Sequence, residues 1–466
     1  MPPLSIEFDW VDAEGVRGPE LCATWASLQI KAADSVVTRV LDTRAKTVRD
    51  FVYVPIYPLA EWLVTNWWFL THEFGSPAKE GNPDFHRRHS LGANREGYAF
   101  PSLDVVSSGS WTHLTWKRDQ SPWTKVEFLE QGELWMDSDE FRERCADVID
   151  RVIRRLVSMG VDGTFLQEEW EAIQTADKDE AQFCQTAAGL GWDPYALDDR
   201  QSHWVIMFAD SLGRLLGEAV PAVNAEDSDE EWFGIADALW RTKKHRSLPL
   251  HRILSLRHEA YPDEIAVPLS LGIFHEHLEF LPDAQPRGVG YPWHAGYNCA
   301  RRLRQHLNLD GQPLPTMPHL AEALGEDAGS IRKVTRPLAA SSGWPALVDG
   351  IITRTDDGSP AFALRALRGD SQRFHFCRAL GEVLLSPDFD TLLTKTYSER
   401  QQRNRAFAAE FLAPASGLRD RIPQPVVDAD DIDELAVEYG VSPYVIEHQV
   451  KNHRIARVSA AVDPAN

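Results

Sequence analysis

The sequence has few cysteines, few basic residues and no long apolar run, and each shortage excludes a class of protein. Its five cysteines are scattered, odd in number and never spaced as CxxC, which argues against a disulfide framework and a cysteine zinc knuckle. Only 48 Lys and Arg stand against 70 Asp and Glu, and the net charge of −22 disfavours direct binding to nucleic acid. No stretch approaches the roughly eighteen apolar residues of a membrane helix, so we expect no membrane partner.

The start of the chain, MPPLSIEFDW, lacks the basic residues and apolar core of a signal peptide. Together with the scattered thiols, this predicts a cytoplasmic protein. With 466 residues, of which 43% are apolar, the chain is long enough for several domains of about 100–200 residues each. We therefore expect a globular, multi-domain protein of the α+β class.

The first predicted domain, residues 1–135, is β-rich. Stretches such as LSIEF (4–8) and RDFVYVPIY (49–57) alternate with a period of two and carry β-branched and aromatic residues, as strands do. One segment, residues 58–73, is instead apolar on nearly all sides of a helix. We expect that helix to be buried against the sheet.

The second predicted domain, residues 136–285, is helical. Its first helix has Ser138 as the expected N-cap and Gly160 at its end. The segment 168–197 is spaced like a helix-turn-helix pair, but it carries one Lys and no Arg, which favours a structural pair over a DNA-reading one. Further helices are expected at residues 166–175, 178–190, 203–217 and 228–241.

A Pro- and Gly-rich stretch around residues 280–292 predicts a domain boundary. The third predicted domain, residues 293–455, combines helices with extended segments and is a compact α+β unit. A flexible tail, residues 456–466, is expected to follow it. The helices are predicted at 293–309, 317–324, 373–386, 398–412, 430–439 and 442–450, and the extended segments near 331–336, 346–354 and 360–367.

The sequence contains no HExxH motif, which binds zinc through two histidines four residues apart on a helix. His275 and His277 lie two residues apart and could face the same side of a strand. Because no third ligand accompanies them, they are interpreted as ordinary polar-face histidines. The sequence also has no GxSxG motif and no Gly-rich phosphate loop.

The last third of the chain contains, in this order, QRFHFCRALGEVLLS (372–386), RNRAFAAEFLAP (403–414) and DIDELAVEYGVSPYVIEHQVKN (431–452). The order of these three stretches resembles the ImmA/IrrE family of zinc metallopeptidases. That family has a helix with the motif His-Glu-Leu-Gly-His, then a helix with Phe-Ala-Ala-Glu-Leu-Leu-x-Pro, then a terminal helix pair.

The chain departs from the family at the residues that perform the chemistry. The resemblance puts the first zinc ligand on Arg378, the general base on Ala379 and the second ligand on Glu382. A guanidinium group has no lone pair for a metal, and an alanine cannot move a proton. We therefore predict no catalytic residues, no metal ligands and no cofactor.

The family's third ligand is an acidic residue near the start of its second helix. Here Glu399 lies too far upstream, and Gln401 and Gln402 are nearer the expected place. Since Arg378 and Glu382 stand four residues apart on one helix, we hypothesise that they form an ion pair where zinc would have been.

These observations favour a catalytically inactive relative of the ImmA/IrrE peptidases that serves as a protein-binding or regulatory module. The resemblance implies a helix-turn-helix repressor as its partner. The alternative is an active zinc metalloendopeptidase with non-standard ligands, drawn from His275, His277 or His375. His375 lies three residues before Arg378 and would face the same site.

Overall fold

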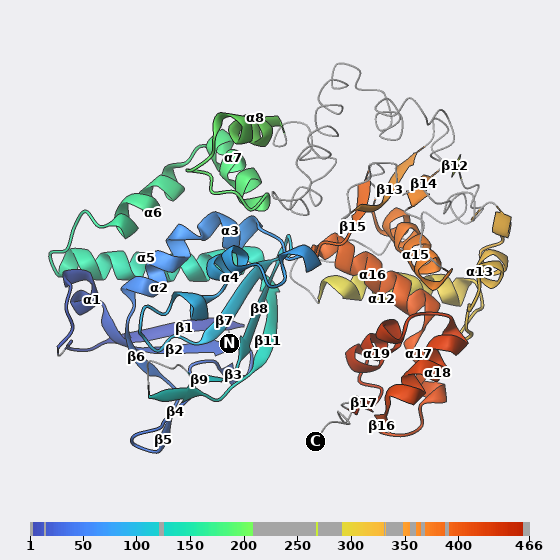
Figure 1. The fold of residues 1–466 in the computed structure, drawn as a ribbon, viewed down its shortest axis with the longest axis horizontal. Helices are drawn as coiled ribbons and strands as arrows, with labels where there is room; N and C mark the ends of the chain where they lie inside the picture. The colour runs from blue at the N-terminus through green and yellow to red at the C-terminus, as the bar shows by residue number, and fades with distance from the viewer. Residues whose placement is uncertain are drawn as a thin grey trace. The chain divides into compact units, whose positions relative to one another are not determined.

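The computed structural model describes residues 3–13, 15–120, 125–207, 267–268, 291–329, 331, 348–354, 360–364, 369–386 and 391–459. These residues fall into two compact units (Figure 1), the first ending at Met207 and the second beginning at Val267. None of the described helices is both long and apolar enough to cross a membrane. His275, His277 and the helix predicted at 228–241 lie outside the described residues.

The strands of the first unit form three small antiparallel sheets, as the alternating pattern predicts. Residues of β1 face those of β2 in register, for example Phe8 opposite Leu28. One sheet contains β1 (Leu4–Trp10), β2 (Trp25–Ala32), β3 (Ser35–Val36) and β6 (Val52–Pro55); another β4 (Val40–Asp42), β5 (Thr47–Arg49), β9 (Asp119–Gln120) and β10 (Val126–Phe128); the third β7 (Ser102–Ser107), β8 (Trp111–Lys117) and β11 (Gly132–Asp137).

The helix predicted over residues 58–73 is two helices, α2 (Tyr57–Thr65) and α3 (Trp67–His72). They break at Asn66, whose side chain donates a hydrogen bond to the carbonyl oxygen of Trp62 at 2.9 Å. The other helices of the unit are α1 (Pro19–Ala23), α4 (Pro83–His89), α5 (Ser138–Ser158), α6 (Phe165–Thr175), α7 (Lys178–Gly189) and α8 (Asp199–Met207), with short 3₁₀ turns at Pro77–Lys79 and Leu91–Asn94.

Helix α5 is capped by Asp137, not by Ser138 as the sequence suggested. The Asp137 carboxylate accepts hydrogen bonds from the main-chain N–H groups of Asp139 and Glu140. The Ser138 hydroxyl instead bonds to Thr112 and to the carbonyl of Gly109, in the hairpin between β7 and β8. Asp and Ser are both favoured caps, so their order alone does not decide between them.

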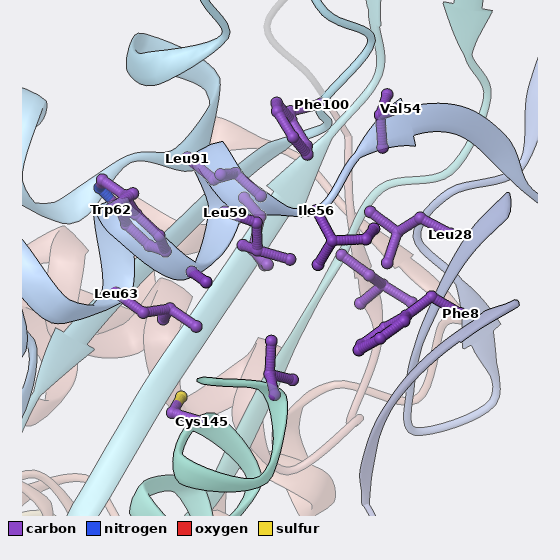
Figure 2. Close-up of a cluster of buried hydrophobic side chains, with 14 of the residues drawn as sticks. Phe8, Leu28, Val54, Ile56, Leu59, Trp62, Leu63, Leu91, Phe100 and Cys145 are labelled. Carbon is purple, nitrogen blue, oxygen red and sulfur yellow. The ribbon is translucent and has the colours of Figure 1, made fainter. Parts of the chain in front are cut away.

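The core of the first unit joins the strands to the helices. Figure 2 shows Phe8 and Leu28 from the strands, Leu59 from α2 and Cys145 from α5 in one buried apolar cluster. Helix α5, assigned above to the second predicted domain, therefore shares a core with the β-rich segment. The three-part division itself stays a prediction, because much of the predicted middle domain lies outside the described residues.

The second unit is an α+β structure, as predicted. Its antiparallel sheet has the order β12 (Val267–Pro268), β14 (Pro360–Leu364), β13 (Val348–Arg354) and β15 (Thr391–Thr394). Its helices are α12 (Pro292–His306), α13 (Met317–Ala323), α15 (Gly369–Leu385), α16 (Glu399–Leu412), α17 (Ala415–Arg421), α18 (Ala429–Tyr439) and α19 (Pro443–Asn452). Arg457 and Val458, in the predicted tail, form β17 and pair in parallel with β16 (Val426–Val427).

Helices α12, α15 and α16 pack closely at the centre of this unit (Figure 1). Two glycines make the close approach possible. A Cβ on Gly296 of α12 would lie 2.1 Å from the carbonyl oxygen of Arg403, and one on Gly381 of α15 would lie 2.7 Å from the ring of Phe407. As a result, every residue of α15 from Phe376 to Leu384 is buried.

Candidate functional site

Helix α15 carries two charged side chains into the core of the second unit, those of Arg378 and Glu382. The Arg378 guanidinium donates three hydrogen bonds, each to a different element. Nη1 lies 2.7 Å from Oδ2 of Asp349 in β13, and Nη2 lies 2.7 Å from the carbonyl oxygen of Thr394 in β15 and 2.8 Å from Oε1 of Gln401 in α16. We call Arg378, Asp349, His375, Thr394 and Gln401 the arginine centre.

Asp349 supplies the negative charge of the arginine centre. Its side chain is 2% exposed, and Oδ2 also lies 3.3 Å from Nε2 of His375. Burial alone would raise the pKa of Asp349, but the hydrogen bond from His375 and the charge of Arg378 outweigh it and lower that pKa below its usual range. Asp349 is thus held as a carboxylate by two partners on α15.

A second guanidinium, that of Arg405, lies beside the arginine centre. Its Nη2 is 3.2 Å from the Thr394 carbonyl oxygen that Arg378 also uses, and its Nη1 is 2.7 Å from the carbonyl oxygen of Thr396. Burial, reinforced by the charge of Arg378, lowers the pKa of Arg405 to about 9. Two guanidinium groups against one carboxylate give this part of the core an excess of positive charge.

Arg378 and Glu382 do not form the hypothesised ion pair. Glu382 accepts a hydrogen bond from Asn404 through Oε2 and lies 3.3 Å from Arg403 and 3.5 Å from Arg400, all on α16. The hypothesis was wrong because a spacing of four residues places both side chains on one side of the helix without fixing where each extends. Arg378 extends toward the strands and the start of α16, and Glu382 toward the next turn of α16.

Of the two glutamines that the sequence put nearer the place expected for the family's third ligand, Gln401 contacts Arg378. Its Oε1 accepts from Arg378 and, at 3.1 Å, from the main-chain N–H of Thr394. Gln402 instead bonds to the carbonyl oxygen of Tyr397 at 2.5 Å.

The residues of the arginine centre do not fit a zinc ion. Arg378 offers donor N–H groups where a metal needs lone pairs, Ala379 has no functional group, and Glu382 is directed to the arginines of α16. Only two residues of the arginine centre, Asp349 and His375, have an acidic or imidazole side chain that could bind a metal. Across the described residues, no three side chains from His, Cys, Asp and Glu gather closely enough to hold a metal.

The sequence reasoning placed His375 correctly and missed Asp349. His375 faces the site as expected, since it shares Asp349 with Arg378. Asp349 belongs to no motif, and 29 positions separate it from Arg378. The available signal was one carboxylate in the apolar strand segment ALVDGII (346–352), because a carboxylate in a buried strand requires a cationic partner.

Residues 365–451 match the family model described as the IrrE N-terminal-like domain. This stretch runs from just before α15 to the last turn of α19. It contains the first two motifs from which the resemblance was drawn and all but the last residue of the third. The chain therefore carries an ImmA/IrrE-like, metallopeptidase-like domain in its C-terminal part. No curated protein and no solved structure matches the chain.

Proposed function

We propose that the ImmA/IrrE-like domain is catalytically inactive and that it serves as a protein-binding or regulatory module. The observation that carries this proposal is the environment of Arg378. Both Nη atoms of its buried guanidinium bond to acceptors from β13, β15 and α16, at the position that corresponds to a zinc ligand of the family. Catalysis by the family's route needs a metal to polarise the substrate and a base to activate water.

Electrostatics supports the same conclusion. A divalent cation at the arginine centre would lie close to the charges of Arg378 and Arg405, which share the Thr394 carbonyl. The carboxylate of the arginine centre, Asp349, contacts both Arg378 and His375 through Oδ2. Ala379, in the place of the general base, has no side-chain group that could accept a proton from water.

We further propose that the partner is a protein of the helix-turn-helix repressor class, as the family resemblance implies. The scaffold on which a polypeptide could bind is kept: the core clusters α12, α15, α16 and the α18–α19 pair around one apolar interior. A protein partner also agrees with the net charge of −22, which opposes binding to a polyanion.

Metal analysis of the purified full chain tests the loss of catalysis. We expect far less than one zinc per chain after dialysis against a zinc-containing buffer, and the same value for Glu382→Gln. Stoichiometric zinc in the parent chain that disappears in the Glu382→Gln variant would overturn the proposal in favour of a metallopeptidase with non-standard ligands.

A binding experiment tests the regulatory role. The full chain is mixed with purified candidate helix-turn-helix repressors, with and without EDTA. Association is measured by calorimetry, and gel electrophoresis follows the integrity of the repressor. We expect association with an intact repressor in both conditions. Cleavage that EDTA abolishes would support the enzyme, and the absence of association would reject the repressor as partner.

A further inference from the structure

A pocket of about 360 Å³ opens on the second unit between α17, β16 and α18, away from the arginine centre. Its floor is apolar and consists of the buried side chains Ile422, Val427 and Leu435. Its rim carries three acidic side chains of α18, those of Asp431, Glu434 and Glu438, together with Arg421 and Gln424. The pocket thus joins an apolar interior to a negatively charged entrance.

Two of the three acidic groups on the rim are already engaged. Glu438 forms an ion pair with Arg421. Asp431 accepts a hydrogen bond from the main-chain N–H of Asp428 at 3.1 Å, as part of the capping box of α18. Glu434 is exposed and has no hydrogen bond or ion pair with the described part of the chain. Glu434 is therefore the carboxylate that can accept a hydrogen bond from a ligand.

An Arg or Lys side chain fits this arrangement better than an apolar or acidic one. Its aliphatic stem can lie against Ile422 and Leu435 while its cationic head reaches the rim at Glu434. A charge-assisted bond between a guanidinium and a carboxylate is among the stronger hydrogen bonds in proteins. An acidic ligand would be repelled by the same rim.

The strand beside the pocket can hold the backbone that carries such a side chain. Val427 of the floor belongs to β16, and its neighbour Val426 is 48% exposed. In the described part of the second unit, β16 pairs with β17 along one of its two edges. An extended peptide that adds to a strand edge places its side chains into adjacent pockets.

We propose that this pocket, which we call the acidic pocket, receives an Arg or Lys side chain from an extended segment of a protein partner. The inference rests on the proposed function in that it assigns a docking surface to the binding module. It is independent of the arginine centre, because no residue of that centre lines the pocket.

The test uses the full chain and two fluorescent peptides of alternating Val and Thr, one with a central Arg and one with citrulline, its uncharged isostere. We expect saturable binding of the Arg peptide at physiological salt. The citrulline peptide should bind about tenfold more weakly, since a charge-assisted hydrogen bond is lost. Equal binding of both peptides, or no saturable binding of the Arg peptide, would overturn the proposal.

A matched pair of variants locates the binding. Glu434→Gln should weaken the Arg peptide about tenfold and leave the citrulline peptide unchanged. Asp433→Asn, on the same helix but outside the pocket, removes the same net charge and should leave both affinities within about twofold. Both residues are exposed, so folding should be unaffected, as circular dichroism can verify.

Equal losses in the two variants would mean that the acidic field of the whole chain, and not the pocket, attracts the peptide. The result is separable from that of the metal analysis. Zinc bound in stoichiometric amount would reject the inactive-peptidase proposal without changing the expected difference between Glu434→Gln and Asp433→Asn. Equal binding of the two peptides would reject the acidic pocket without restoring catalysis.

Discussion

Two buried charged side chains, Glu73 in the first unit and Arg378 in the second, have opposite kinds of surroundings. In the first unit the Glu73 carboxylate accepts from Lys79 at 3.0 Å, from Arg88 at 2.7 and 2.8 Å, and from His89 at 3.1 Å. In the second unit the Arg378 guanidinium donates to one carboxylate and two neutral carbonyl oxygens. An anion among cations thus contrasts with a cation among mostly neutral acceptors.

The origin of the partners differs as well. Those of Glu73 come from within 16 positions along the chain, so local folding brings them together. Those of Arg378 come from β13, β15 and α16, and 29 positions separate Asp349 from it. A cation that binds acceptors from several elements stabilises their packing, as a structural metal does in other proteins. We infer that the arginine centre stabilises the arrangement of these elements without a metal.

Removing the charge of Glu73 should have the largest effect. Glu73→Gln leaves Lys79 and Arg88 without their counter-charge in a buried place, and we expect a loss of about 3–5 kcal/mol in the free energy of unfolding. Tryptophan fluorescence in urea can follow this unit, because 12 of the 16 tryptophans precede residue 208.

The control for Glu73 is Asp84→Asn, which breaks an exposed ion pair with Arg87 and should cost less than about 1 kcal/mol. A loss for Glu73→Gln no larger than for this control would contradict the view that the buried cations depend on one carboxylate.

The next effect concerns Arg378. Arg378→Met removes the donor of three hydrogen bonds, but Asp349 keeps His375, and we expect a smaller loss of about 2–3 kcal/mol. Hydrogen exchange by mass spectrometry should show faster exchange in β13 and β15. Arg378→Lys keeps the charge, but a lysine ammonium lacks the planar guanidinium geometry that reaches all three acceptors. The free energy of unfolding of this variant should therefore lie between those of the parent chain and the Met variant.

A double variant distinguishes a paired charge from an isolated one. Arg378→Met with Asp349→Asn removes both charges, and its loss should be smaller than the sum of the single losses, since no buried charge is left unpaired. Additive losses would mean that Arg378 and Asp349 contribute independently, and the arginine centre would then not be a coupled unit.

The free energy of unfolding should depend on pH through the ionisation of two buried carboxylates, those of Glu73 and Asp349. The charge of Lys79 and the hydrogen bonds from His89 and Arg88 lower the pKa of Glu73 despite its burial, and the pKa of Asp349 is lowered for the reasons given above. A carboxylate with a lowered folded-state pKa contributes stability above its unfolded-state pKa, near 4, and loses it as the pH falls further. We expect the free energy of unfolding to fall by about 1–3 kcal/mol between pH 5 and pH 3.

Asp349→Asn provides the control for this pH dependence. In that variant, protection of β13 against hydrogen exchange should vary less between pH 5 and pH 3 than in the parent chain. An unchanged pH dependence would show that Asp349 is not ionised in the folded state.

Helices α12, α13, α15, α16, α18 and α19 of the second unit could be predicted from periodicity and family motifs, because both depend on residues close together in sequence. Helix α17 and strands β15 and β17 were not predicted. The contacts of the arginine centre could not, because Asp349 and Thr394 reach Arg378 only through the pairing of β13 with β15 and of both with the helices. In the first unit, the break at Asn66 was missed for a related reason: the apolar pattern continues through it, while a local side-chain bond ends the helix.

The smallest loss of stability is expected for Glu382→Gln. It can be compared directly with that of Arg378→Met, because both residues are buried on the same helix. The cationic partners of Glu382, which are Arg400 and Arg403, are 27% and 20% exposed, so solvent screens part of their interaction. Glu382→Gln retains an oxygen that can accept from Asn404 and should cost only about 1 kcal/mol by urea unfolding and hydrogen exchange of α16. A loss as large as that of Arg378→Met would show that α15 is held equally by both charges. The arginine centre would then not be the main polar interaction that stabilises the packing of α15 on the sheet.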